Sequence, residues 1–317
     1  MTDGRADPRV RTVFIGSGGF GVPSLRGLES SGEASLVGVV TAPRRPAGRT
    51  HELTPTRVHV AAQELGIKTI LTPERLRSPE SIAEILALAP ALLVLADYGQ
   101  IVPAELLGVR HGALNLHPSL LPRHRGATPI PAAILAGDSE TGVTLMRMDA
   151  GLDTGPVVAQ ERVALDGTET APELEEALML KAAHLLGRNL GPWIGGGLTG
   201  APQPDVGATL TRPLRREAGR LDPGKPAVEL ERQVRAYQPW PGSFVDTAAG
   251  RVVVWSASPG ASGGPAKGIL DERGLGVGDG DVLVLIEVQP AGGKRMTWEA
   301  LLRGKPALVG SPVLAGP

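Results

Sequence analysis

The sequence contains no cysteine, which excludes disulfide bonds, thiolate catalysis and cysteine-ligated zinc. This absence also fits a reducing compartment. No apolar run approaches the roughly 18 residues that a membrane-spanning helix needs. Residues 1–12 carry no apolar stretch of the kind found in secretion signals. We therefore expect a soluble, cytoplasmic protein that does not act at a membrane.

A strong net charge is also missing, and so is a metal-ligand pattern. The six histidines are scattered, so we expect no metal site. The net charge of −1 creates no general attraction for nucleic acid. The charge is uneven, because residues 206–317 hold 14 Lys and Arg against 11 Asp and Glu, a net of +3. This weakly basic part alone is slight evidence for a polyanionic partner.

The length of 317 residues and a hydrophobic content of 42% favour about two globular domains. Strands and helices alternate in the first part, which predicts an α/β fold with a Rossmann-like, doubly wound, mostly parallel sheet. The later short strands predict a smaller, OB-like β-barrel. We expect a catalytic domain over 1–195, a linker over the Gly- and Pro-rich residues 196–211, and a C-terminal domain over 212–317.

Three polar residues favour a catalytic site. Asn115 and His117 are two residues apart at the end of a predicted strand, so their side chains point to the same face. Asp153 lies between glycines in GLDTG. A neutral histidine can take a proton from an amine, a carboxylate favours the charged imidazole, and an amide can donate to an oxyanion. A lone histidine is more often structural, but this combination predicts acyl transfer to an amine.

Other motifs each allow two interpretations. GSGGFG at 16–21 matches a dinucleotide-binding turn, but no acidic residue ends the next strand, so we interpret it as a tight turn and expect no NAD. SLLP at 119–122 forms either a turn or an apolar wall for a flat heterocycle. RHRG at 123–126 and the Pro-rich loop 42–49 are solvated loops or anion contacts. The same two interpretations hold for an arginine cluster, Arg212, Arg215, Arg216 and Arg220.

The chain resembles the folate-dependent formyltransferases nearly from end to end. The signature lies in NLHPSLLPRHRGATPI at 115–130 together with GLDTG at 151–155. DYGQIVP at 97–103 is similar to the folate-side loop of that family. RRPAGR at 44–49 is similar to a loop of its tRNA-acting branch, and RQVRAYQPWPGSFV at 232–245 to its C-terminal barrel-like domain.

The resemblance implies transfer of the formyl group of 10-formyltetrahydrofolate to the α-amine of methionyl initiator tRNA, for translation initiation. It also implies a monomer. Asn115, His117 and Asp153 would be catalytic. The implied folate-binding residues are Tyr98, Gly99, Ser119, Leu120, Leu121 and Pro122. Arg44, Arg45 and Arg49 would contact tRNA.

Two departures concern the folate side of the site. GSGGFG replaces a turn that usually contains Thr-Pro, and Asp97 replaces a small residue. A relative that formylates a UDP-amino-sugar shares both domain types and is the main alternative. RRPAGR and the basic second domain favour tRNA over that sugar. A nicotinamide-dependent dehydrogenase, suggested by GSGGFG, and a non-catalytic tRNA-binding protein are alternatives of other classes.

Overall fold

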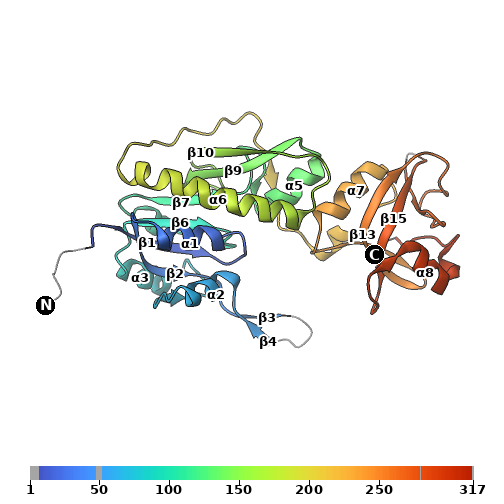
Figure 1. The fold of residues 1–317 in the computed structure, drawn as a ribbon, viewed down its shortest axis with the longest axis horizontal. Helices are drawn as coiled ribbons and strands as arrows, with labels where there is room; N and C mark the ends of the chain where they lie inside the picture. Colours follow the sequence, from blue (N-terminus) through green and yellow to red (C-terminus); the bar gives the residue numbers. More distant parts are fainter. Residues whose placement is uncertain (1–6, 48–51, 279, 316–317) are drawn as a thin grey trace. The chain divides into compact units, whose positions relative to one another are not determined.

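The computed structural model describes residues 7–47, 52–278 and 280–315 and divides into two compact units (Figure 1). The first unit comprises residues 1–129, 140–164 and 175–211. The second comprises residues 130–139, 165–174 and 212–317. Two short segments that the sequence-based boundaries assign to the first domain are therefore part of the second unit.

A seven-stranded sheet forms the centre of the first unit. In sheet order its strands are β10 (Val157–Ala164), β9 (Glu140–Arg147), β7 (Ala113–His117), β6 (Leu92–Ala96), β1 (Val10–Gly16), β2 (Ala34–Val40) and β5 (Ile70–Leu71). The last five strands of this order are parallel, whereas β9 pairs antiparallel with both β7 and β10. The mostly parallel, doubly wound sheet that the sequence predicts is confirmed.

The central strands are apolar because both faces of the sheet are covered. All five residues of β6 are buried. Ile15 and Leu93 belong to one buried cluster with Ile85 of α3 (Pro79–Ala87), while Phe14, on the opposite face of β1, is also fully buried. The remaining helices of this unit are α1 (Val22–Ser30), α2 (Arg57–Glu64), α4 (Ala104–Leu107) and most of α6 (Ala171–Ile194).

Side-chain caps fix where two of these helices begin. The Ser78 hydroxyl accepts a hydrogen bond from the Ser81 N–H at the start of α3, and Thr56 does the same for His59 at the start of α2. Each cap satisfies a backbone donor that has no partner within the helix and contributes about 1 kcal/mol. The prediction that Ser78 caps a helix is confirmed.

Residues 42–54 differ from the expected loop. They contain an antiparallel pair of three-residue strands, β3 (Arg45–Ala47) and β4 (Glu52–Thr54). Arg44 and Arg45 are exposed. Arg49 lies outside the described residues. Strands this short, one with a proline at its centre, leave no alternating pattern in the sequence that would predict them.

The second unit is a curled antiparallel sheet with helices packed on it. Its strands follow the order β12 (Ser243–Thr247), β13 (Gly250–Gly260), β15 (Val282–Pro290) and β14 (Gly274–Gly276), and β16 (Met296–Thr297) also pairs with β15. The helices are α5 (Pro129–Ala136, from Ile130), α7 (Ala227–Ala236), α8 (Trp298–Gly304), η1 (Arg216–Gly219) and η2 (Pro306–Leu308). Leu230 of α7 and Trp298 of α8 share one apolar core with Val254 and Leu285. The barrel-like domain is confirmed as a half-barrel.

The segment expected to link the domains is paired with the first unit over much of its length. Ala201 bridges to Val157 through two backbone hydrogen bonds. Further along, β11 (Leu210–Thr211) pairs in parallel with β8 (Arg125–Gly126). Residues 201–211 therefore lie beside the RHRG segment rather than apart from the sheet.

Candidate active site

Strand β7 brings Asn115 and His117 to the carboxyl end of the parallel strands. The strand pairs with β6 on one side and with β9 on the other, which fixes its register. Asn115 and His117 share one face, and Leu114 and Leu116 are buried on the other. His117, the last residue of β7, is only 4% exposed, whereas Asn115 is half-buried.

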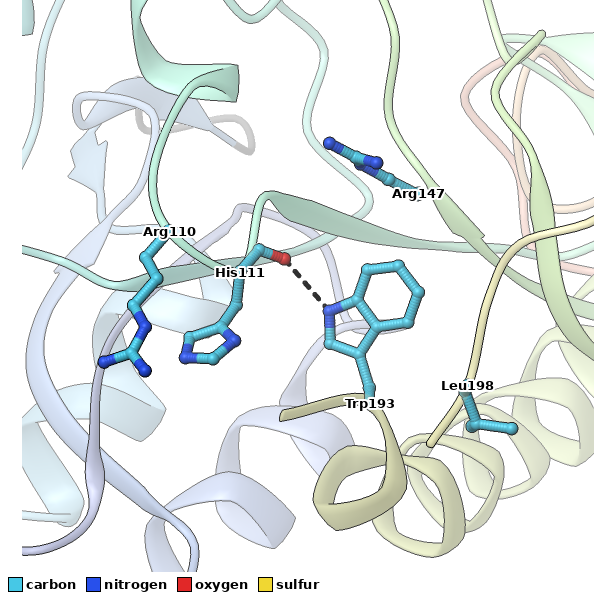
Figure 2. Close-up of a pocket in the computed structure, with 5 residues that line it drawn as sticks. All are labelled: Arg110, His111, Arg147, Trp193 and Leu198. Carbon is cyan, nitrogen blue, oxygen red and sulfur yellow. Dashed lines mark hydrogen bonds between the residues drawn. The ribbon is translucent and has the colours of Figure 1, made fainter. Parts of the chain in front are cut away.

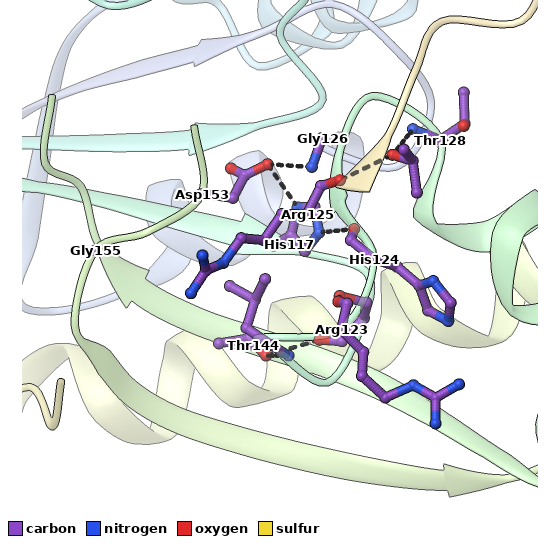
Figure 3. Close-up of polar contacts among 12 residues, drawn as sticks. His117, Arg123, His124, Arg125, Gly126, Thr128, Thr144, Asp153 and Gly155 are labelled. Carbon is purple, nitrogen blue, oxygen red and sulfur yellow. Dashed lines mark hydrogen bonds and ion pairs between the residues drawn. The ribbon is translucent and has the colours of Figure 1, made fainter. Parts of the chain in front are cut away.

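The His117 ring lies between two acceptors (Figure 3). Its Nε2 is 2.9 Å from the carbonyl oxygen of His124, and its Nδ1 is 3.7 Å from Oδ2 of Asp153. A carbonyl oxygen only accepts, so Nε2 carries the proton in the neutral ring. Nδ1 is therefore unprotonated in the neutral ring and is the nitrogen that can take up a proton.

Asp153 is held in place by the chain around it. Its backbone is in the left-handed region, with φ of +52°, and its Oδ2 accepts a hydrogen bond of 2.8 Å from the Gly126 N–H. The neighbouring Gly155 has no room for a side chain, because a Cβ there would collide with the Arg147 carbonyl. The loop that carries the carboxylate is thus closely packed against the end of β9.

Burial and the carboxylate act on the imidazole in opposite directions. Burial lowers the pKa of His117 and is the larger effect, while the negative charge of Asp153 raises it. The net result is a pKa below the ordinary value for histidine. The ring is therefore neutral near pH 7 and able to act as a base.

The amide of Asn115 is available for a ligand. Within the part of the chain that the structure describes, no protein group forms a hydrogen bond with this side chain. Because Asn115 is two residues from His117, its side chain lies on the same face of β7 as the imidazole. The trio predicted from the sequence is therefore brought together at one strand end.

The predicted folate residues of SLLP divide into two pairs. Ser119 is fully buried, and its hydroxyl donates to the Arg123 carbonyl at 2.6 Å. Leu121 is also buried, and its N–H donates to Thr144 Oγ1 at 3.1 Å. Leu120 and Pro122 are half-buried. The first pair shapes the loop, and the second pair can contact a ligand.

The other predicted folate residues follow β6. Tyr98 is half-buried, and its hydroxyl is buried without a hydrogen-bond partner among the described residues. Desolvation raises the Tyr98 pKa to about 12, so the hydroxyl keeps its proton. Gly99 is exposed.

The two features that depart from the family pattern, the GSGGFG turn and Asp97, are in contact. Asp97 has a φ of +52°, and its carboxylate occupies the space where a Cβ of Gly18 would lie. Part of the Asp97 side chain is exposed, yet enough protein surrounds it that desolvation raises its pKa. A side chain at the third position of GSGGFG would therefore displace the Asp97 carboxylate, which follows β6.

Several residues of the site carry no sequence signal. Thr144 and Gln160 hold the SLLP loop, since Gln160 Nε2 donates to the Leu121 carbonyl and to Thr144 Oγ1, both at 2.9 Å. Gln203 bonds to the backbone of the GLDTG loop. An isolated glutamine or threonine has no spacing that could have revealed these roles.

The arginine cluster that begins the second unit separates into different environments. Arg220 forms an ion pair of 2.8 Å with Asp246 and is half-buried, so it has a structural role within the unit. Arg212, Arg215 and Arg216 are exposed. These three arginines retain the interpretation of a phosphate contact.

A separate cavity of about 170 Å³ lies at the amino end of β7 (Figure 2). It is lined by Arg110, His111, Arg147, Trp193 and Leu198, and the Trp193 indole N–H donates to the His111 carbonyl at 3.0 Å. None of the predicted catalytic residues lines this cavity. Across the described residues, no cluster of His, Asp or Glu is arranged to hold a metal ion, and no helix is long and apolar enough to cross a membrane.

Comparison with known families gives matches to both units. A family model described as "Formyl transferase" matches residues 10–190, and one described as "Formyl transferase, C-terminal domain" matches residues 213–306. A methionyl-tRNA formyltransferase of Myxococcus xanthus is 40% identical over 97% of this chain and 99% of its own length. That of Halorhodospira halophila is 42% identical over 96% of this chain and 99% of its own.

Solved structures share the fold at low identity. An N-formyltransferase from Helicobacter canadensis, in complex with folinic acid and dTDP-3-aminofucose, has a TM-score of 0.62 at 16% identity, covering 87% of this chain and 98% of its own. HypX from Aquifex aeolicus, in complex with tetrahydrofolic acid, has a TM-score of 0.61 at 17% identity, covering 93% of this chain and 47% of its own. At these identities the likeness concerns the fold alone.

Proposed function

The chain belongs to the formyl transferase family, and we propose that it formylates the α-amino group of methionyl initiator tRNA with 10-formyltetrahydrofolate as donor. The relatives that support this acceptor are about 40% identical over nearly the whole length of both chains. The sugar formyltransferase shares only the fold, at 16% identity. The sugar acceptor therefore serves as a control rather than as a second candidate.

One observation carries the assignment of the catalytic residues. A buried imidazole presents an unprotonated Nδ1 to a carboxylate 3.7 Å away, on the same strand face as an amide that has no hydrogen-bond partner among the described residues. Transfer of a formyl group to an amine needs a base for the amine proton and a donor for the carbonyl oxygen. Asn115, His117 and Asp153 supply these groups at the carboxyl ends of the strands, where such sheets bind ligands.

Each residue has one role in this proposal. His117 accepts a proton from the attacking amine at Nδ1, which Asp153 favours by stabilising the imidazolium. The hydrogen bond from Nε2 to the His124 carbonyl keeps the ring oriented during this transfer. Asn115 donates an N–H to the formyl oxygen as negative charge develops there.

The residues expected to bind folate fit a flat, polar heterocycle. Tyr98 contributes a buried hydroxyl with no partner among the described residues, and Leu120 and Pro122 contribute half-buried apolar surface. The Gly99 backbone is accessible, and Ser119 and Leu121 hold the loop in shape. When bound, 10-formyltetrahydrofolate supplies the formyl group.

The tRNA contacts remain an inference from residue type and exposure. Arg44 and Arg45 are exposed beyond the carboxyl end of β2, and Arg49 belongs to the same sequence motif. Guanidinium groups bind phosphates well. We propose that this motif contacts tRNA, that residues 1–195 form the catalytic domain, 196–211 a linker, and 212–317 a tRNA-binding domain.

Two further expectations concern the protein as a whole. We propose that it acts as a monomer, which sedimentation at working concentration measures. We also propose that it works in the cytoplasm, which cell fractionation measures.

The decisive experiment offers the enzyme two acceptors. With 10-formyltetrahydrofolate as donor, formyl transfer to charged initiator tRNA is measured beside transfer to a UDP-amino-sugar. We expect rapid transfer to the tRNA and no significant transfer to the sugar. The reverse preference would overturn the proposed acceptor, and transfer to neither would overturn the proposed reaction.

A further inference from the structure

The side chain of Gln203 uses all of its hydrogen-bonding capacity between two loops of the candidate site. Its Nε2 donates to the Asp153 carbonyl at 2.8 Å and to the Gly155 carbonyl at 2.7 Å. Its Oε1 accepts from Arg125, from Nε at 3.0 Å and from Nη2 at 2.7 Å. An arginine only donates and a carbonyl only accepts, so this network allows a single orientation of the amide.

These two loops carry the contacts of the His117 ring. The loop bound by Nε2 supplies the Asp153 carboxylate that faces Nδ1. The loop bound by Oε1 contains His124, whose carbonyl accepts from Nε2 of His117, and Gly126, whose N–H holds the carboxylate. A shift of either loop would change the distance between the carboxylate and the imidazole.

The rest of the segment supports the same loop. Thr209 Oγ1 accepts from the His124 N–H at 2.8 Å, and Thr211 Oγ1 accepts from the Thr128 N–H at 3.0 Å. Together with the pairing of β11 and β8, these contacts fix the RHRG backbone. Gln203 joins the Arg125 side chain of that segment to the backbone of the GLDTG loop, beside the direct hydrogen bond from the Gly126 N–H to the Asp153 carboxylate.

We propose that Gln203 is a positioning residue, which holds the Asp153 carboxylate at its working distance from His117 by tying the GLDTG loop to Arg125. The proposal rests on the proposed function of Asp153 and His117. Gln203 belongs to the expected linker, so a residue of that segment would contribute to the chemical step. A displacement of about 1 Å in such a constellation can lower the rate as much as 100-fold.

The test replaces Gln203 with methionine, which has a similar length and no hydrogen-bonding amide. We expect kcat to fall about 10- to 100-fold, while KM for folate and for tRNA changes less than about threefold. Gln203→Asn keeps the amide but is one methylene shorter, so it cannot reach both loops. It should shift kcat in the same direction and provides the measurement if the methionine variant does not fold.

A second readout separates positioning from general destabilisation. The imidazole of His117 is titrated by NMR in ¹⁵N-histidine-labelled protein and assigned by its loss in His117→Ala. The titratable groups that face this ring are Asp153 and His124. If Asp153 moves away, the His117 pKa falls, so the midpoint should move to lower pH in Gln203→Met.

A matched control breaks a glutamine network elsewhere. Gln289 in the second unit accepts from the Trp255 indole at 3.0 Å and donates to the Gly293 carbonyl at 2.9 Å. Gln289→Asn should leave the His117 midpoint unchanged. An unchanged midpoint in both Gln203 variants would overturn the proposal, even if kcat fell through loss of folded protein. The titration needs no substrate, so it stays informative if formyl transfer to tRNA is not observed.

Discussion

A histidine lies near each end of β7, His111 just before the strand and His117 as its last residue, and only one of them has the environment of a base. Burial lowers the pKa of both His111 and His117. Beside His111, the positive charge of Arg110 lowers the pKa further. Beside His117, the negative charge of Asp153 opposes the effect of burial. The same residue type is thus placed against charges of opposite sign near the two ends of β7.

This difference shows what makes a histidine useful for proton transfer. A base must be neutral before the reaction and stabilised when it becomes charged. His117 meets both requirements, because burial keeps it neutral and the carboxylate favours the imidazolium. His111 meets only the first. We therefore propose that the carboxyl edge of the sheet is the reactive one, and the cavity at the amino edge provides matched controls.

The largest expected effect separates the two histidines directly. His117→Ala should lower kcat for formyl transfer roughly 10²- to 10⁴-fold, the usual contribution of general acid–base catalysis. Binding of tRNA, measured by filter binding, should stay nearly unchanged. His111→Ala should keep kcat within about twofold. An equal fall in kcat in the two variants would mean that the two histidines do not differ in function. An equal loss of tRNA binding and of kcat in His117→Ala would mean that His117 is structural.

Removing the charge next to His117 should have the second largest effect. Asp153→Asn should lower kcat about 10- to 100-fold, because the negative charge that stabilises the imidazolium is lost. In the wild type, kcat should fall only as pH drops through the lowered His117 pKa, below about 6.5. In Asp153→Asn this acid limb should move to still lower pH. A move to higher pH would mean that the carboxylate does not face the working nitrogen.

A third variant tests the packing at the carboxyl edge. Gly18→Ala should reduce the free energy of unfolding by about 1 kcal/mol, because its Cβ would displace the Asp97 carboxylate, the end of an exposed side chain. Gly27→Ala, on an exposed turn of α1 with open space around it, should be neutral or stabilising. Denaturant unfolding measures both. If Asp97→Ala fails to recover the loss in the double variant, the contact is not its cause.

The smallest expected effect comes from substituting arginines at the carboxyl edge of the sheet, with arginines at the amino edge as the control. Changing Arg44 and Arg45 to alanine should raise KM for tRNA a few-fold and weaken its salt dependence, while KM for folate stays constant. Changing Arg110 and Arg147, the exposed arginines of the amino-edge cavity, should leave KM for tRNA within experimental error. A larger rise with the second pair would place the tRNA contact at the other edge.

The sequence predicts which candidate catalytic residues lie at the carboxyl edge of the sheet. It does not predict the residues that hold them in place. Asn115 and His117 follow from alternation along a strand, and Asp153 follows from a short motif, because both signals are local. Gln203 is 50 residues from Asp153 in sequence and has no local pattern. The same holds for the contact of Gly18 with Asp97, which two distant strand ends create.

The hydrogen bonds of residues 201–211 also decide where the chain can be divided. A fragment that stops at residue 200 would keep Asn115, His117 and Asp153 but lose Gln203, Thr209 and Thr211. An exchange of C-terminal domains between relatives should therefore join the two parts after Thr211. These eleven residues therefore belong with the unit that holds Asn115, His117 and Asp153, although their composition resembles that of a spacer.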